Sequence, residues 1–277
     1  MTTVTTARIE SLHIYPVKSC RGLTLTQASL GPTGLMDDRG WLVVSARDRF
    51  LTQREVPRLA TIQTALLPNG VRLSALGMSD IDIDSETRGE RRKITVWRDT
   101  LEAIDAGDAA ARWLSEYTQM PVRLVRFAAD ARRVSSREWT GEVEALNQFS
   151  DGYPILIIST ASLADLNSRL PQGVGPLPMN RFRPNIVVSG VDAYAEDRIH
   201  ELHGDGVRLR IVKPCTRCKI TTTDQLTGEV TGEEPLTTLK SYRWSEALRG
   251  VMFGQNVISI GAGGALKQGQ DLQVVWK

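Results

Sequence analysis

Short apolar runs bounded by turn residues recur along the whole chain, which is the pattern of β-strands. Gly, Pro, Asn and Asp separate the runs, as at residues 30–32 and 68–70. The pattern predicts strands at residues 9–17, 41–44, 60–67, 93–97, 186–188, 207–212 and 272–276.

Helical periodicity is sparser than the strand pattern. Residues 108–117 and 161–170 each place apolar side chains on one side of a 3.6-residue repeat. Thr160 is predicted to cap the second of these helices, and residues 239–248 form a third candidate helix. Many strands and few helices together predict β-barrels or a β-rich α+β fold.

The stretch 128–145 interrupts this alternation with polar and charged residues and few apolar anchors. It is predicted to be a linker or mobile loop whose charges face solvent. A chain of 277 residues holds one large domain or two modest ones, at roughly 100–200 residues per domain. The polar stretch favours two domains, over residues 1–125 and 126–277.

The composition is that of a globular protein, with 41% hydrophobic and 24% charged residues. A net charge of +2 gives no large field of one sign, so neither nucleic acid nor a membrane is an expected partner. Residues 1–10 lack the pattern of a signal peptide, and no apolar run is long enough to span a membrane. Three cysteines, an odd and low number, are typical of an intracellular protein with free thiols, so a cytoplasmic location is expected.

The sharpest chemical feature is the pair Cys215 and Cys218, which enclose Thr216 and Arg217. A structural zinc site usually has two such pairs or one pair with two histidines; here one pair is present, His200 and His203 are the only histidines near it, and zinc stays a minor alternative. A thioredoxin-like redox pair is expected at a helix start, but the following residues 220–223 are β-prone. Two further interpretations stay open: a thiolate on a soft metal beside a cation, and two inert core cysteines. Spacing alone favours the inert pair.

Three polar segments have the composition of an anion-binding site. Residues 15–22 (Tyr-Pro-Val-Lys-Ser-Cys-Arg-Gly) end a predicted strand and open a loop whose lysine, serine and backbone N–H groups suit a phosphate. Residues 181–185 place two arginines and an asparagine before the strand at 186–188, and residues 38–39 are an Asp-Arg pair. Each has an ordinary alternative: a basic turn, a surface arginine pair and a surface salt bridge.

Taken together and in order, these segments resemble the MOSC superfamily, named for the C-terminal domain of molybdenum cofactor sulfurases. The likeness is strongest to the subgroup of the mitochondrial amidoxime-reducing component and its bacterial relatives, over nearly the whole chain. It implies a β-rich α+β fold with few helices, in which an N-terminal MOSC β-barrel domain (1–125) packs on a MOSC β-barrel domain (126–277). The matching segments are residues 15–20, 38–43, 162–167, 182–187, 215–218 with 221–222, and 235–236 with 239–243.

The resemblance also implies roles, carried over position by position. Cys218 would be the catalytic thiolate that ligates molybdenum, with Cys215 in a supporting role. Relatives often carry small hydroxyl residues where this chain has Gly152 and Tyr153, so backbone contacts are expected there; Gln225 replaces a frequent proline in a turn. The predicted contacts to a molybdenum–molybdopterin cofactor are Lys18, Ser19, Arg39, Gly152, Tyr153, Arg183, Asn185, Thr216 and Arg217.

The implied activity is a molybdenum-dependent oxidoreductase that reduces N-hydroxylated compounds such as amidoximes, hydroxylamines or N-hydroxylated bases. Some bacterial relatives carry a ferredoxin-like domain with four iron-binding cysteines, and no such cluster occurs up to Lys277. Electrons are therefore expected from a separate flavin, haem or iron–sulfur protein. The alternative is a cofactor carrier or a sulfur-transfer protein. Pyridoxal phosphate binding would belong to the family's sulfurases, whose pyridoxal-binding domain has no counterpart in this sequence.

Overall fold

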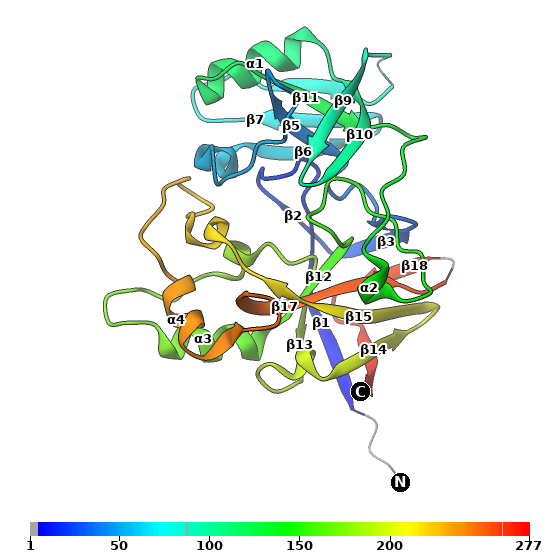
Figure 1. The fold of residues 1–277 in the computed structure, drawn as a ribbon, viewed down its shortest axis with the longest axis vertical. Coiled ribbons are helices and arrows are strands. Elements are labelled where there is room, and N and C mark those ends of the chain that lie inside the picture. The colour runs from blue at the N-terminus through cyan, green and yellow to red at the C-terminus, as the bar shows by residue number, and fades with distance from the viewer. Residues whose placement is uncertain (1–4, 87, 262) are drawn as a thin grey trace.

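The computed structural model describes residues 5–86, 88–261 and 263–277. Its larger unit is a barrel of seven strands, which closes within the described residues because β12 pairs with β17 as well as with β13 (Figure 1). In spatial order the barrel strands are β12 (Ile155–Ser159), β13 (Ile186–Ser189), β1 (Thr6–Ile14), β19 (Asp271–Trp276), β14 (Ile199–Gly204), β15 (Val207–Thr216) and β17 (Gly250–Ser259).

Alternation of side chains along the barrel strands directs one apolar face inward. In β1, Ala7 and Ile9 are fully buried, whereas Arg8 and Glu10 are exposed. Burying one Leu or Ile side chain contributes roughly 1.5–3 kcal/mol, so this interior is a main source of stability. Its fully buried members include Ala7, Ile9, Leu12, Ile157, Val188, Leu202, Leu209, Val257 and Leu272.

Short strands and two helices surround the barrel. The parallel strands β12 and β13 are joined through α3 (Thr160–Arg169), and α4 (Leu236–Arg243) contacts β17. Two short strands extend the barrel sheet. β2 (Leu23–Leu25) pairs with β1, and β16 (Trp244–Ser245) pairs with β17. A separate three-stranded sheet contains β18 (Gly264–Lys267), β3 (Gln27–Gly31) and β4 (Gly34–Leu35).

The smaller unit, in the upper part of Figure 1, contains two sheets and one long helix. α1 (Asp108–Thr118) packs its apolar side, including the fully buried Leu114, against β11 and neighbouring strands. One sheet has the order β5 (Trp41–Ser45), β11 (Val122–Phe127), β10 (Asp99–Asp105) and β9 (Arg91–Val96). The other has the order β6 (Gln63–Leu67), β7 (Gly70–Ser74) and β8 (Ile81–Asp84).

The first strand joins the two units. β1 lies in the barrel between β13 and β19, although it opens the part of the chain predicted as the N-terminal domain. The chain then crosses to the smaller unit, where Val17 bridges to Trp41 and the backbone N–H of Lys18 donates to the carbonyl of Trp41. Residues 15–22 therefore lie at the seam between the units. The domain division at residues 125 and 126 stays a prediction.

The β-rich fold with few helices is confirmed, and most predicted strands are present. The strand predicted at 9–17 spans Thr6–Ile14, the strand predicted at 207–212 extends to Thr216, and four other local expectations were wrong. The strand predicted at 60–67 begins at Gln63, because a 3-10 helix with Pro57 at its start occupies Pro57–Thr61. Ser159 caps α3 in place of Thr160, since its Oγ accepts a hydrogen bond from the N–H of Ser162.

The other two corrections concern the last helix and the cysteine motif. The helix predicted at 239–248 ends at Arg243, because Trp244 is extended and pairs with Val251. The β-prone residues 220–223 lie mainly in a 3-10 helix, Lys219–Thr222, whose N-cap is Cys218. The motif therefore precedes a short helical turn, though not the long α-helix of a redox βαβ unit.

The stretch 128–145 is not a solvated linker. It contains α2 (Arg137–Thr140), and several of its polar side chains are buried, including Arg133 and Ser135. Arg133 is 6% exposed because its guanidinium binds the segment that follows. Within the described ranges, no helix has both the length and the apolar composition that crossing a membrane demands.

Candidate functional site

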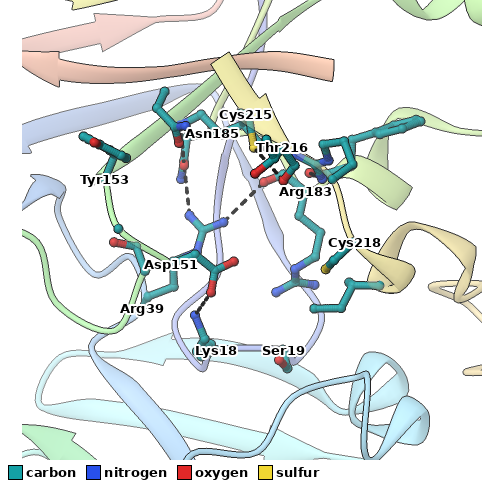
Figure 2. A pocket seen from close by; sticks show the side chains of 17 residues that line it. Lys18, Ser19, Arg39, Asp151, Tyr153, Arg183, Asn185, Cys215, Thr216 and Cys218 are labelled. Atoms are coloured by element: carbon teal, nitrogen blue, oxygen red, sulfur yellow. Dashed lines mark hydrogen bonds and ion pairs between the residues drawn. The ribbon is translucent and has the colours of Figure 1, made fainter. Parts of the chain in front are cut away.

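One pocket lies at the seam between the two units, and all ten predicted site residues line it (Figure 2). In the view of Figure 2, Cys218 and Tyr153 stand on opposite sides, and Lys18 and Ser19 lie along the lower edge. The lining residues are Lys18, Ser19, Arg39, Ser150, Asp151, Gly152, Tyr153, Leu156, Phe182, Arg183, Asn185, Cys215, Thr216, Arg217, Cys218, Ile220 and Asn256. The sequence segments thus meet in space, while their roles stay predictions.

Tyr15 organises the loop that follows β1. Its ring lies so close to Gly22 that a Cβ at that position would come within 2.5 Å of it, so only glycine fits. The Tyr15 hydroxyl donates to the carbonyl of Pro184 at 3.0 Å, which ties the loop to the segment before β13. The guanidinium carbons of Arg39 and Arg183 lie 4.5 and 4.1 Å from the ring centroid. The buried tyrosine therefore sets the positions of two predicted cofactor contacts.

Asn185 connects the barrel to this arginine pair. Its side-chain oxygen accepts hydrogen bonds from Arg39 Nη1 at 2.9 Å and from the backbone N–H of Leu156 at 3.1 Å. Its side-chain nitrogen donates to the carbonyl of His13 at 3.1 Å. Asp38 also binds the Arg39 guanidinium and accepts from the backbone N–H of Tyr15. The Asp38–Arg39 pair is therefore buried at the seam and is not a surface salt bridge.

Three of the site residues have left-handed backbone conformations. The φ angles are 70° at Ser19, 53° at Arg39 and 56° at Arg183. Such a conformation costs a non-glycine residue roughly 1–2 kcal/mol. Strain of this kind persists only where surrounding contacts fix the backbone, and it is concentrated at functional sites.

Lys18 and Asp151 form the main ion pair in the pocket. Lys18 Nζ donates to Asp151 Oδ1 at 2.6 Å and to the carbonyl of Phe149 at 2.7 Å. The lysine side chain is 7% exposed and the aspartate side chain 67% exposed. Burial lowers the pKa of Lys18 even though the carboxylate favours its charged form. Burial would raise the pKa of Asp151, but the charge and hydrogen bond of Lys18 outweigh it and hold that pKa well below its usual value.

Arg183 is a buried cation of the pocket whose charge lacks a carboxylate partner among the described residues. It is 9% exposed, and burial together with the charge of Arg39 lowers its pKa to about 10. Its Nη1 donates to the side-chain oxygen of Gln225 at 3.2 Å, and Gln225 is itself hydrogen-bonded to Gln53 of the smaller unit. Among the residues the structure describes, no carboxylate forms an ion pair with Arg183.

The cysteine motif lies where β15 ends. The strand extends to Thr216, beyond the predicted end at 212, and its register shifts near Pro214, which cannot donate to the ladder. Arg217 Nη1 lies 3.0 Å from Cys215 Sγ, and its Nη2 donates to the carbonyl of Phe182 at 2.7 Å. Cys215 is half-buried, whereas Cys218 is exposed at the pocket. The two thiols therefore have different surroundings, and Cys218 is the accessible one.

Protein side chains alone do not complete a metal site. Among the described residues, no group of three or more His, Cys, Asp or Glu side chains is placed to hold a metal ion. A metal on Cys218 would have to take most of its ligands from a cofactor.

The resemblance points to the loop at 151–153 as a whole, but no role was predicted for the side chains of Tyr15, Asp151, Gln225 or Arg133. Tyr15 and Asp151 stand beside assigned residues, so proximity in the motifs was a usable signal. Gln225 was noted as a replacement in a turn, yet its contact with Arg183 depends on folding. Arg133 gave no signal, because it is one of many charges in a polar stretch.

Two family models together match most of the chain. Residues 6–121 match the model of the MOSC N-terminal beta barrel domain, and residues 145–273 match that of the MOSC domain. The chain is 38% identical over 257 residues to the human (Homo sapiens) protein named mitochondrial amidoxime-reducing component 1, covering 90% of this chain and 75% of that protein. Human mitochondrial amidoxime reducing component 2 is 34% identical over 244 residues, covering 85% and 72%.

A third relative has a different name. A protein of Oryza sativa subsp. japonica called molybdenum cofactor sulfurase is 33% identical over 266 residues, and the match spans 31% of its length. Fold, pocket and domain matches define a two-domain MOSC protein with a function related to the molybdenum cofactor. The chain belongs to the family of the mitochondrial amidoxime-reducing components.

Proposed function

We propose that this protein holds a molybdenum–molybdopterin cofactor through Cys218 and reduces N-hydroxylated compounds with it. The observation that carries the proposal is the single pocket lined by all ten residues expected to contact the cofactor. Relatives named amidoxime-reducing components support the reductase activity. The intracellular location expected from the cysteines stays a prediction.

The charges around the pocket fit a bound anion. Lys18, Arg39, Arg183 and Arg217 line it, and the carboxylates paired with them are Asp38 and Asp151. An anion would relieve the unfavourable burial that lowers the pKa of Arg183. The pocket therefore suits the phosphate of a cofactor better than a neutral ligand.

Unused hydrogen-bond donors in the pocket also fit such a ligand. The backbone N–H groups of Asp151, Gly152 and Tyr153 have no acceptor among the described residues. The buried Nε of Arg217 likewise has no partner there. Consecutive backbone N–H groups form anion-binding sites, and buried donors are normally satisfied. This supports backbone contacts at Gly152 and Tyr153, where the side chains depart from the family pattern.

Different residues would bind different parts of the cofactor. Lys18, Arg39 and Arg183 would hold the phosphate, and Thr216 and Asn185 would offer donors and acceptors to the pterin. Cys218 would supply the thiolate ligand, since it is the exposed cysteine. When bound, the cofactor would supply two-electron reduction, which removes the oxygen of an N-hydroxylated substrate as water. The protein would orient the cofactor, and the exposed position of Cys218 would leave that side open to a small substrate.

The proposal is tested by loading the purified chain with molybdenum cofactor. Molybdenum content is measured by mass spectrometry, and reduction of benzamidoxime is followed with reduced methyl viologen as the electron donor. We expect stoichiometric metal and turnover in the wild type, and loss of both in Cys218→Ala. The matched control is Cys215→Ala, which alters the same motif at a half-buried thiol and is expected to retain the metal.

Distinct outcomes separate the alternatives. Full metal content and activity in Cys218→Ala would overturn the ligand assignment. A metal-loaded wild type without turnover on any N-oxygenated substrate would instead favour the cofactor carrier. The electron donor is proposed to be a separate flavin, haem or iron–sulfur protein, so NADH alone is expected to give no turnover. Turnover with NADH and no second protein would contradict that partner.

A further inference from the structure

A buried arginine outside the predicted site fixes the loop that forms one wall of the pocket. Arg133 Nη1 donates to the side-chain oxygen of Asn147 at 2.7 Å and to the carbonyls of Gln148 and Ser150 at 2.9 and 2.5 Å. Its Nη2 donates to the carbonyl of Asp151 at 3.4 Å. The loop at 147–151 therefore curves around one guanidinium.

The same guanidinium is anchored on its other side. Arg133 Nε donates to Asp99 Oδ2 at 2.7 Å, and Asp99 begins β10 of the smaller unit. Asn147 is 1% exposed, and its side-chain nitrogen donates to Ser135 Oγ and to the carbonyl of Gly152. The loop, the stretch before α2 and the smaller unit are thus held by one connected set of hydrogen bonds.

These contacts decide where the loop's N–H groups point. In a trans peptide the C=O and the N–H of the next residue point in opposite directions. The carbonyls of Ser150, Asp151 and Gly152 face Arg133 and Asn147. The N–H groups of Asp151, Gly152 and Tyr153 therefore face away from Arg133, and these residues line the pocket (Figure 2).

We propose that Arg133 is a positioning residue of the cofactor site, which turns three consecutive N–H groups toward an oxyanion in the pocket. The inference rests on the proposed function for the identity of that oxyanion, the phosphate of the cofactor. Arginine suits this role because its planar fork offers five donors, whereas lysine offers three on a point charge. Arg133 itself does not line the pocket, so it would act through the loop and not by direct contact with the cofactor.

The test uses the purified full chain without cofactor and inorganic phosphate as the probe. Titration calorimetry gives the dissociation constant, and hydrogen–deuterium exchange reports the amides of residues 151–153. In the wild type we expect phosphate to protect these amides. In Arg133→Gln we expect affinity to fall by about tenfold, which is a change of about 1.4 kcal/mol, and the protection to disappear.

A matched control is Arg123→Gln. Arg123 pairs with two carboxylates in the smaller unit, those of Asp105 and Asp108, and it does not line the pocket. This control should lose stability and keep phosphate affinity and amide protection. A role of Arg133 in stability alone would make the two variants behave alike.

If Arg133→Gln fails to fold, Arg133→Lys tests the inference instead, because lysine keeps the positive charge and lacks the planar guanidinium group. Weaker phosphate binding and lost amide protection in a folded lysine variant support the inference. Unchanged affinity and protection in either folded variant overturn it, as does a wild type that binds no phosphate. Because no metal is present, the result is independent of turnover: phosphate binding that depends on Arg133 can hold even if Cys218 binds no molybdenum.

Discussion

Asp151 competes with any anion for Lys18, and replacing it by asparagine tests this. Lys18 is buried, and its two acceptors are Asp151 Oδ1 and the carbonyl of Phe149. An asparagine at 151 keeps a side-chain oxygen for the hydrogen bond and removes the negative charge. The Asp151→Asn variant is therefore expected to be less stable without anion, and to bind phosphate more tightly than the wild type.

The size of both effects depends on how exposed the Lys18–Asp151 ion pair is. Charges about 4 Å apart interact by about 1 kcal/mol in water and by about 4 kcal/mol near a protein surface. The Asp151 side chain is 67% exposed, so the lower end applies and solvent screens the pair. Removing the charge should cost about 1 kcal/mol of unfolding free energy and strengthen phosphate binding by a similar amount, about fivefold in the dissociation constant.

Both quantities are measured on the chain without cofactor, by urea denaturation and by calorimetric titration with phosphate at low salt. The control is Asp82→Asn, which breaks an exposed ion pair with Arg72; neither residue lines the pocket, so phosphate affinity should be unchanged. An Asp151→Asn protein that binds phosphate as weakly as the wild type, or more weakly, would refute the competition. It would show that Asp151 supports the anion site by orienting Lys18.

Three further changes test other parts of the structure. Asn185→Ala removes three hydrogen bonds, two within the barrel and one to Arg39, and should lower the unfolding free energy by about 2–4 kcal/mol in denaturant titrations. Asn185→Asp should cause the same loss only if the bond that the amide nitrogen donates to His13 accounts for it. Leu209→Ala, in the barrel interior, should lower the unfolding free energy by about 2–5 kcal/mol and leave the phosphate affinity of the folded protein unchanged. A loss of phosphate affinity in this variant would contradict the separation of core and pocket. Burial would raise the pKa of Glu201, but hydrogen bonds from two arginines and a histidine outweigh burial and lower this pKa to about 2. The stability that the charged Glu201 contributes is therefore present above about pH 4.5 and is lost as the pH falls toward 2. Glu201→Gln should therefore remove that part of the acid sensitivity, and an identical pH profile of stability in both proteins would exclude it.

Much of the fold was predictable because most of its strands coincide with short sequence patterns that can be recognised locally. The runs at 41–44, 186–188 and 272–276 are short, apolar and bounded by turn residues, and each is a strand. Errors arose where tertiary contacts outweigh propensity. Residues 220–223 are β-prone, yet the turn after β15 makes them a 3-10 helix, and Trp244 leaves its helix to pair with Val251.

The residues that line the pocket were predictable from the family resemblance, but the contacts that hold its wall in place were not. Lys18, Arg183 and Cys218 each stand in a recognisable motif, so their meeting in one pocket could be expected. The role of Arg133 depends on carbonyl directions, which follow from how the loop folds around the side chain. No periodicity or spacing in a polar stretch encodes this, and composition alone suggested a solvated linker.

The seam explains how the site retains strained and buried groups. Left-handed backbone at Ser19, Arg39 and Arg183 costs roughly 1–2 kcal/mol each, and neither unit alone provides all the contacts that fix them. The carbonyl of Ser19 accepts from Gln53 of the smaller unit, and Gln53 also exchanges hydrogen bonds with Gln225 of the larger one. Because the same contacts join the units and shape the pocket, separating the units would disrupt the pocket even if the barrel kept its fold. The pocket is therefore a property of the joined units, and its lining residues come from widely separated parts of the sequence, at 18–39 and at 150–256.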